Sequence, residues 1–413
     1  MEQSVVVGID VGTTKICTLV GREENPDQIR IIGVGIEPSQ GLRKGVVVDL
    51  AAAAQAVGRS IDKAERTSGM EISSALVSLA GSQVSSLNSK GVVGVSGRVI
   101  DQEDVARAIE AARAVSLPHN QEIIHVIQRG FNVDGQEGIR MPIGMHGYRL
   151  EVETHIITAS AASVENLRQC VGASGVEVSQ FVLNPLASAE VVLNETERQM
   201  GVVVCDIGGG TSDIAIYING DVWYTAVIPF GGNHVTSDIA HGLRLPISQA
   251  EEIKVKHGNA IEAEVDAQEF FNIRPFGEDQ PVQINRAELA HIIEARAEEM
   301  ISFVLEEIKR SGYDGLLPAG MVLTGGTSLL PNLRNLAARV LGVPVRVAKP
   351  EKLIGMADRL NSPAFSTSVG LLRWAYLMNE FMPQGVKKHP RYSDTETVVN
   401  WEMVKNWLRR LLP

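Results

Sequence analysis

The most constraining feature of this 413-residue sequence is a pattern that occurs twice. In the first copy a valine-rich run reaches Asp10 and then the turn Gly12-Thr13-Thr14-Lys15. In the second copy a valine-rich run reaches Asp206 and then the turn Gly208-Gly209-Gly210-Thr211. A further apolar run follows each turn, which predicts two strands joined by that turn. Two copies are too few for a solenoid, so they predict two related lobes that face each other.

The residue types in these turns suit a bound triphosphate. Glycine lets backbone N–H groups approach phosphate oxygens closely, and threonine hydroxyls can reach the same oxygens. The carboxylates of Asp10 and Asp206 are predicted to hold Mg²⁺, through water. One such turn alone is usually a plain hairpin, whereas two matched copies predict phosphate binding. The predicted phosphate-binding residues are Gly12, Thr13, Thr14, Lys15, Gly208, Gly209, Gly210 and Thr211.

A third glycine turn, Leu323-Thr324-Gly325-Gly326-Thr327-Ser328, follows another apolar run. Alone it is an ordinary strand-to-helix turn. Together with the other two turns it predicts the adenosine side of the same cleft, through Gly325, Gly326 and Thr327. Glu251 and Lys254 lie three positions apart on a predicted helix, and the sequence by itself favours a solvated ion pair there.

Composition and missing motifs argue against several other classes of protein and of functional site. The net charge of −11 disfavours general binding of nucleic acid. The three isolated cysteines indicate a reduced compartment without disulfides, and no apolar run approaches the ~20 residues of a spanning helix. The sequence contains no Walker P-loop, no HExxH, no CxxC and no GxSxG. The expectation is a cytoplasmic protein of at least two domains with no signal peptide.

Hydrophobic periodicity predicts an α/β pattern in both lobes. The strands predicted in the first lobe are 5–11, 16–20, 29–35 and 75–80, and those in the second are 202–207, 214–218 and 320–324. Residues 84–161 are predicted to be less regular, with strands at 122–127 and 148–158. The predicted helices are 50–68, 103–115, 161–174, 185–193, 233–243, 248–257, 286–310, 333–341 and 368–378.

At these three turns the sequence resembles the superfamily of actin, hexokinase and the heat-shock chaperones. Within it, the sequence resembles the FtsA family of bacterial cell division proteins over nearly its whole length. The stretches that carry this likeness are 32–35, 46–50, 204–211, 253–258 and the tail with Trp401, Trp407, Leu408 and Arg409. The tail is the most discriminating of them, because the kinases and chaperones lack it.

The resemblance implies an actin-like ATPase fold: duplicated ribonuclease-H-like cores, an inserted α+β subdomain and a C-terminal amphipathic helix. ATP and Mg²⁺ would lie between the cores, with Glu251 and Lys254 at the ribose. The implied parts are a first core (1–83 and 162–198), the insert (84–161), a second core (199–247 and 312–381), a further subdomain (248–311), a linker (382–397) and the helix (398–413).

The resemblance also implies partners. The family docks the C-terminal tail of the tubulin homologue FtsZ on the subdomain at 248–311, where Arg296 and Glu299 match implicated positions. An exposed ion pair is the ordinary alternative for these two residues. Self-association, anionic membrane lipids and other division proteins are further implied partners, and the implied location is the cytoplasmic face of the inner membrane at the division septum.

Weak ATP hydrolysis is the most that the resemblance implies, with Asp10 and Asp206 as candidate catalytic residues. The chaperones orient the attacking water with a glutamate, but the matching position here is Asn184, and an amide is not a useful general base. Two other functions stay open. One is a small-molecule kinase of the same fold, for which the sequence offers no second-substrate base. The other is a PilM-like pilus-assembly adaptor, which the tail argues against.

Residues 398–413 form an amphipathic pattern. On a helical wheel the apolar residues Trp401, Met403, Val404, Trp407, Leu408, Leu411 and Leu412 share one arc, and Arg409 and Arg410 lie opposite. The segment is too polar to span a bilayer, so it is predicted to lie in the membrane interface. Residues 384–413 have six basic and three acidic side chains. This basic end would face anionic lipid while the acidic body is repelled.

This pattern yields a first testable expectation. Leu408→Glu places a charge at the centre of the apolar arc, so we expect it to release the protein from anionic liposomes while ATP binding is unchanged. Co-sedimentation with liposomes measures the first property and calorimetry the second. A variant that sediments as well as the original sequence would show that the tail is not the anchor.

Overall fold

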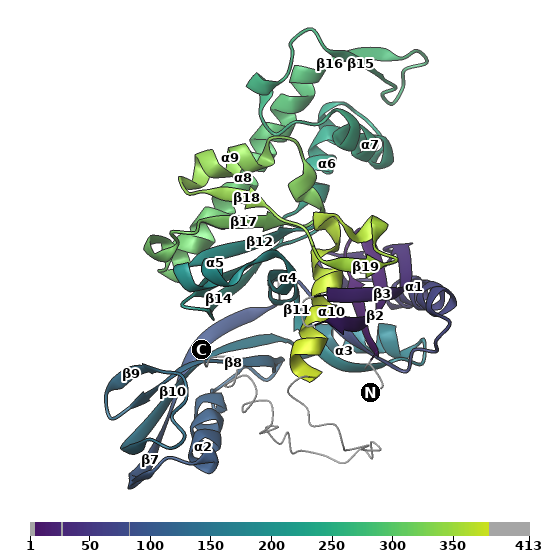
Figure 1. Cartoon of the computed structure of the whole chain (residues 1–413). Helices are drawn as coiled ribbons and strands as arrows, with labels where there is room; N and C mark the ends of the chain where they lie inside the picture. The colour runs from purple at the N-terminus through teal and green to yellow at the C-terminus, as the bar shows by residue number, and fades with distance from the viewer. Residues whose placement is uncertain (1–4, 26–27, 82, 380–413) are drawn as a thin grey trace.

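The structure is a computed structural model that describes residues 5–25, 28–81 and 83–379. Two large sheets form two cores, a separate four-stranded sheet extends from the first core, and a mainly helical subdomain extends from the second (Figure 1). The predicted linker at 382–397 and the predicted helix at 398–413 lie outside the described residues. Within the described ranges, no helix is both long enough and apolar enough to cross a membrane.

The two core sheets repeat one topology. In the first sheet β1, β2 and β3 form an antiparallel meander, and β6 pairs with β1 in parallel. In the second sheet β12, β13 and β14 form the same meander, and β17 pairs with β12 in parallel. The predicted duplication is therefore confirmed as a duplicated sheet. The first sheet has the order β11 (Glu177–Leu183), β6 (Ser74–Leu79), β1 (Val5–Val11), β2 (Lys15–Asn25), β3 (Gln28–Pro38), β19 (Leu353–Gly355). The second has the order β14 (Asp221–Ile228), β13 (Ser212–Ile218), β12 (Val202–Ile207), β17 (Met321–Thr324), β18 (Val345–Val347).

Helices cover both faces of each sheet and bury its apolar side chains. In the first core α1 (Leu50–Ser68) and α3 (Ala161–Gly172) pack on one face, and α10 (Ser366–Asn379) packs on the other. In the second core α6 (Gly232–Gly242), α8 (Arg286–Ser311) and α9 (Leu333–Leu341) share one apolar cluster with the sheet. α4 (Asn184–Val192) packs against strands of both cores and so forms a layer between them. The shorter elements are β4 (Leu42–Arg43), β5 (Val46–Val47), α5 (Glu195–Met200), α7 (Ile247–His257), β15 (Phe270–Ile273) and β16 (Val282–Asn285).

The insert is more regular than its sequence suggests. Its sheet has the order β7 (Ser85–Val99), β10 (His146–Ser160), β8 (Gln121–Val133), β9 (Gln136–Ile139), and α2 (Gln102–Arg113) packs against it. The expectation of an irregular stretch was wrong for β7, in which Gly91 and Val95 are buried and the other positions are exposed or half-buried. A Cβ at Gly91 would overlap the Ala108 carbonyl of α2, so glycine lets the helix lie directly on the strand.

The insert also contacts the second core. His155 of β10 lies 3.0 Å from the hydroxyl of Thr225 on β14, and the Ser86 hydroxyl donates to the Thr225 carbonyl at 2.8 Å. The insert therefore contacts β14 as well as the core from which it emerges.

Most predicted helices are confirmed within one to three residues, and the bounds 50–68 and 333–341 are the same in the structure. β11, β14 and α5 were missed by the sequence analysis. One boundary needs correction: residues 353–379 were placed with the second core, but β19 pairs with β3 and α10 packs on the first sheet. The reason is burial, because Val369, Leu371 and Leu372 join the apolar cluster of β1 and β2.

The two helices between the cores, α4 and α10, cross at very short range. Gly370 of α10 lies directly over α4, and a Cβ there would overlap the backbone carbonyl of Ala187. Since the obstacle is backbone, it cannot move aside as a side chain could. The contact between the two helices therefore depends on the absence of a side chain at Gly370.

A substitution tests this contact. We expect Gly370→Val to lower the free energy of unfolding by about 2–3 kcal/mol, because the extra carbons must separate α10 from α4. Gly172→Ala is the matched control: Gly172 is also helical, nothing lies within 4 Å of the position that a Cβ would take there, and stability should stay the same or rise slightly. Urea unfolding measures both variants, and equal stability of the two would contradict the proposed close crossing.

Candidate functional site

The two duplicated turns have the same backbone geometry. In the first, the Gly12 N–H donates to the Lys15 carbonyl at 3.0 Å, and in the second the Gly208 N–H donates to the Thr211 carbonyl at 2.9 Å. The turns lie close together: a Cβ at Gly209 would overlap the hydroxyl of Thr14. Glycine is therefore required at this position for the two cores to approach each other.

A cavity of about 390 Å³ lies between the turns. Every residue that the sequence analysis assigned to nucleotide or metal lines it, although these residues come from four separate parts of the chain. They are Asp10, Gly12, Thr13, Thr14, Lys15, Asp206, Gly208, Gly209, Gly210, Thr211, Glu251, Lys254, Gly325, Gly326 and Thr327.

Asp10 and Asp206, which follow the two valine-rich runs, are buried at the cavity and held by hydroxyl groups. Asp10 accepts hydrogen bonds from Ser78 at 3.0 Å and from Ser368 at 2.7 Å. Asp206 accepts one from Thr367 at 2.7 Å. Thr367 and Ser368 are consecutive residues in the first turn of α10, so one helix turn fixes a carboxylate of each core.

Electrostatics distinguish the acidic groups around the second turn. Burial raises the pKa of Asp206 to about 6, and the Asp10 charge acts in the same direction. Burial and the charge of Asp206 raise the pKa of Asp213 well above its usual value. Oδ1 of Asp213 and Oδ1 of Asn184 are buried without a hydrogen-bond partner among the described residues. Both side chains line the cavity, so these two oxygen atoms can accept hydrogen bonds from a ligand or from water.

The carboxylates of Asp10 and Asp206 suit a magnesium ion that keeps much of its water. Among the described residues no group of three or more His, Cys, Asp or Glu side chains could hold a metal by itself. Mg²⁺ usually takes one or two carboxylates and completes its shell with water and phosphate oxygens. Asp10 and Asp206 would supply these carboxylates. The ion would neutralise phosphate charge next to the two turns.

The side of the cavity predicted to face adenosine has its own polar network. The Lys254 ammonium donates to Glu251 at 2.7 Å, to the Thr236 hydroxyl at 2.8 Å and to the Gly232 carbonyl at 3.2 Å. The ion pair expected from the sequence therefore exists, and it lies at the cavity rather than in open solvent. Gly325 has φ +83°, and a Cβ there would overlap Asp206 and the Ile207 backbone.

Lys15 is already engaged within the chain. Its ammonium donates to the Ala364 carbonyl at 2.5 Å and lies 4.6 Å from the centre of the Phe365 ring. A contact from Lys15 to a phosphate would therefore compete with this hydrogen bond, which joins the first core to the segment before α10.

Several residues that line the cavity or hold its aspartates were missed by the sequence analysis. Ser78, Thr367 and Ser368 hold the aspartates, and Asn233 lies at the start of α6, where its N–H donates to the Gly209 carbonyl at 2.8 Å. The signals were present as the Ser-Thr-Ser run at 366–368 and the Gly-Gly-Asn at 231–233. Hydroxyls and glycines at a helix start are also common caps, so spacing alone could not assign them.

The predicted partner residues lie away from this cavity. Arg296 of α8 forms ion pairs with Asp238 of α6 and with Glu299. The ordinary ion pair is therefore present, and docking at Arg296 and Glu299 stays a prediction.

Comparison with known proteins agrees with the fold. The family model described as "Cell division protein FtsA" matches residues 203–370, and "SHS2 domain inserted in FTSA" matches residues 81–158. The cell division protein FtsA of Pseudomonas aeruginosa is 39% identical over 98% of this chain and 97% of its own length.

Solved structures share the architecture at low identity. A "PilM-PilN type IV pilus biogenesis complex" chain superposes with a TM-score of 0.63 at 16% identity, covering 89% of this chain and 98% of that one. MreB5 of Spiroplasma citri bound to ADP gives 0.57 at 16% identity, covering 92% and 98%. At such identities these likenesses establish the actin-like fold alone.

Two substitutions test the cavity. We expect Gly209→Val to weaken binding of magnesium–ATP about 100-fold or more, because the side chain fills the space where backbone must approach phosphate. Asp206→Asn should weaken it roughly tenfold, because a charged hydrogen-bond acceptor is lost. Calorimetry with and without Mg²⁺ measures both variants. Gly94→Val, with open space around its Cβ position, is the control. Unchanged affinity in the first two variants would refute the site.

Proposed function

This chain belongs to the FtsA family of actin-like cell division proteins, and on that basis we propose that it binds ATP and tethers FtsZ filaments to the cytoplasmic membrane. The observation that carries the proposal is the 39% identity to a curated cell division FtsA over nearly the full length of both chains. The family models add support, because they match residues 203–370 and the insert at 81–158.

ATP with Mg²⁺ is proposed to bind in the cavity between the cores. Support comes from the paired glycine turns, the two hydroxyl-held aspartates and the unpaired polar atoms of Asn184 and Asp213. Bound Mg²⁺ would supply charge neutralisation. The residues of the chain would position the phosphates through the turn N–H groups and keep both carboxylates oriented through Thr367 and Ser368.

Hydrolysis is proposed to be slow. Asn184 begins α4 at the cavity and contributes an amide where a water-orienting carboxylate would be needed. A protein that keeps its nucleotide for long periods suits an adaptor better than an enzyme with rapid turnover. Asp10 and Asp206 remain the candidates for whatever ATPase activity the protein has.

The remaining partners follow from the family. The subdomain with α8 is proposed to bind the FtsZ C-terminal tail, and residues 398–413 are proposed to bind anionic lipid at the division septum. Self-association would multiply the weak membrane affinity of a single tail, because linked tails bind at high effective concentration. Other division proteins would join through the assembled complex.

No specific observation favours the pilus-assembly adaptor or the small-molecule kinase. The likeness to the pilus protein is one of fold, at 16% identity. A small-molecule kinase would need a base at a second-substrate site. Of the cavity's acidic groups, Asp10, Asp206 and Asp213 lie at the two glycine turns, and Glu251 is paired with Lys254. The family membership therefore favours the division adaptor.

Affinity for an FtsZ C-terminal peptide tests the proposal directly. We expect Arg296→Ala to weaken this binding about tenfold, as loss of an arginine anchor at an interface commonly does. Lys309→Ala, an exposed cation on the same helix, should bind like the original chain. Fluorescence anisotropy measures the three proteins. No binding by the original chain would refute the tether itself, whereas equal binding by all three would refute only the role of Arg296.

A further inference from the structure

A two-residue hairpin lies at one end of the cavity between the glycine turns. β4 and β5 pair directly, so Lys44 and Gly45 form the turn that joins them. Their φ angles are +51° and +74°, and positive values at both positions define a type I′ turn. Asparagine, aspartate or glycine usually precedes the glycine of such a turn, because other side chains disfavour positive φ. Local turn chemistry therefore does not account for the lysine.

The turn is fixed against the first core. The Gly45 N–H donates to the hydroxyl of Thr13 at 3.2 Å, and Gly45 itself lines the cavity. A Cβ at Gly45 would overlap the backbone of Ala80 and Gly81, so the turn lies in direct contact with the loop that follows β6. Contacts on two sides therefore fix the backbone of Lys44 beside the cavity.

The side chain of Lys44 reaches across to the second core. Its ammonium lies 5.8 Å from the centre of the Phe230 ring, which stacks on Phe303 of α8 at 4.8 Å. The residue is half-buried, and its ammonium makes no ion pair with any described residue. Burial of a charge is costly unless a partner offsets the lost hydration. An anionic ligand could supply that partner without breaking an ion pair within the chain.

The ion pair of Glu251 and Lys254 marks the other end of the cavity. The Lys254 ammonium donates to the Gly232 carbonyl at 3.2 Å, and the Gly232 N–H donates to the Gly208 carbonyl at 2.9 Å. The Thr327 hydroxyl donates to the same Gly208 carbonyl at 2.8 Å. This end, where the family resemblance implies ribose, therefore adjoins the first glycine of the second turn.

The third glycine of that turn adjoins the hairpin instead. A Cβ at Gly210 would overlap the Thr13 hydroxyl, which is the group that accepts the hydrogen bond from the Gly45 N–H. The order along the cavity is therefore the ion pair, the glycine turns and then the hairpin. A nucleotide with its ribose at the ion pair and its phosphates at the glycine turns directs its outermost phosphate toward Lys44.

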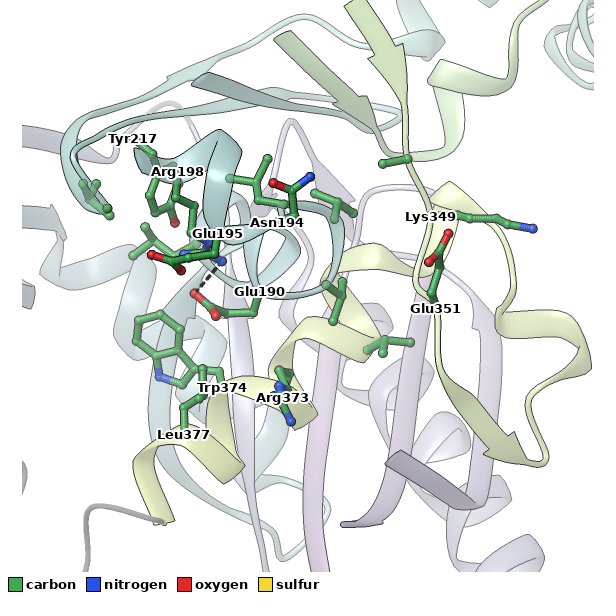
Figure 2. A pocket seen from close by; sticks show the side chains of 18 of the residues that line it. Glu190, Asn194, Glu195, Arg198, Tyr217, Lys349, Glu351, Arg373, Trp374 and Leu377 are labelled. Atoms are coloured by element: carbon green, nitrogen blue, oxygen red, sulfur yellow. Dashed lines mark ion pairs between the residues drawn. The ribbon is translucent and has the colours of Figure 1, made fainter. Parts of the chain in front are cut away.

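Other cations are already engaged or lie elsewhere. Lys15 and Lys254 line the cavity, but both donate hydrogen bonds within the chain. Several arginines and lysines line a second cavity of about 1430 Å³, and none of them lines the cavity between the glycine turns. Figure 2 shows one of them, Arg198, in its ion pair with Glu190 at 3.2 Å. Among the described residues, Lys44 is the cation best placed for the outermost phosphate.

We propose that Lys44 binds the outermost phosphate of a nucleoside triphosphate and so selects triphosphate over diphosphate, an inference that rests on the proposed binding of ATP. The flexible four-carbon side chain exchanges its cation–π contact with Phe230 for a charge-assisted hydrogen bond to phosphate, which is stronger. A diphosphate ends one phosphate short of the hairpin, so it gains no affinity from this residue.

Calorimetry with the full chain and Mg²⁺ compares the binding of ATP and ADP. We expect Lys44→Asn to weaken ATP binding about tenfold or more and to leave ADP binding within about twofold. Asn-Gly is a preferred type I′ pair, so this variant keeps the hairpin while it removes the ammonium. Arg43→Gln is the matched control, because Arg43 is exposed on the same hairpin, and it should bind both nucleotides like the original chain.

Lys44→Arg separates charge from shape. It should keep the preference for ATP, because a guanidinium also binds phosphate. Equal losses of ATP and ADP affinity in Lys44→Asn would show that the lysine only shapes the turn, and the inference would fail. Unchanged ATP affinity in Lys44→Asn would also overturn it, with ATP binding itself intact. If the original chain binds neither nucleotide, the proposed function fails as well.

Chemical labelling gives an independent readout. An amine-reactive ester modifies accessible ammonium groups, and mass spectrometry measures the rate at each lysine. We expect labelling of Lys44 to be slower with ATP than with ADP by about fivefold or more, because the phosphate engages the ammonium. Lys309, which is exposed on α8, should react at the same rate with either nucleotide. Equal labelling of Lys44 with ATP and with ADP would contradict the proposed contact.

Discussion

The first turn of α10 joins the two cores through two adjacent hydroxyl groups. Thr367 donates to Asp206 of the second core, and Ser368 donates to Asp10 of the first. Hydrogen bonds to charged groups contribute more than neutral ones, about 1.5–3 kcal/mol each, and they are stronger in a buried site. The positions of the two glycine turns relative to each other therefore depend on where this one helix turn lies.

α10 is in turn positioned by packing. It lies on β1 and β2 through Leu371 and Leu372 and crosses α4 at Gly370. α4 begins with Asn184 at the cavity between the two glycine turns, and its Glu190 lines a second cavity of about 1430 Å³. Two closely packed helices thus extend from one cavity to the other, and close packing resists small deformations because backbone meets backbone.

The local chemistry of the site was readable in the sequence. Asp10, Gly12, Asp206 and Gly208 occur in two matched strand–turn–strand patterns, and the structure brings both turns to one cavity. The likeness to the FtsA family was also readable, since it rests on contiguous motifs. The strand β7 could not be predicted from the sequence, because its core-facing residues include a glycine and its other face is mostly polar. Its pairing with β10 is set by partners more than forty residues away.

The sequence by itself predicted the duplicated cores and the two matched glycine turns, and it contains the amphipathic pattern at 398–413, because each is encoded by residues that are neighbours along the chain. Only the tertiary structure decided that Thr367 and Ser368 hold the two aspartates, that β19 and α10 complete the first core, and that a large cavity opens behind α4. These features arise between segments far apart in the chain. Periodicity and spacing report which face of an element is buried, but not against which other element it packs.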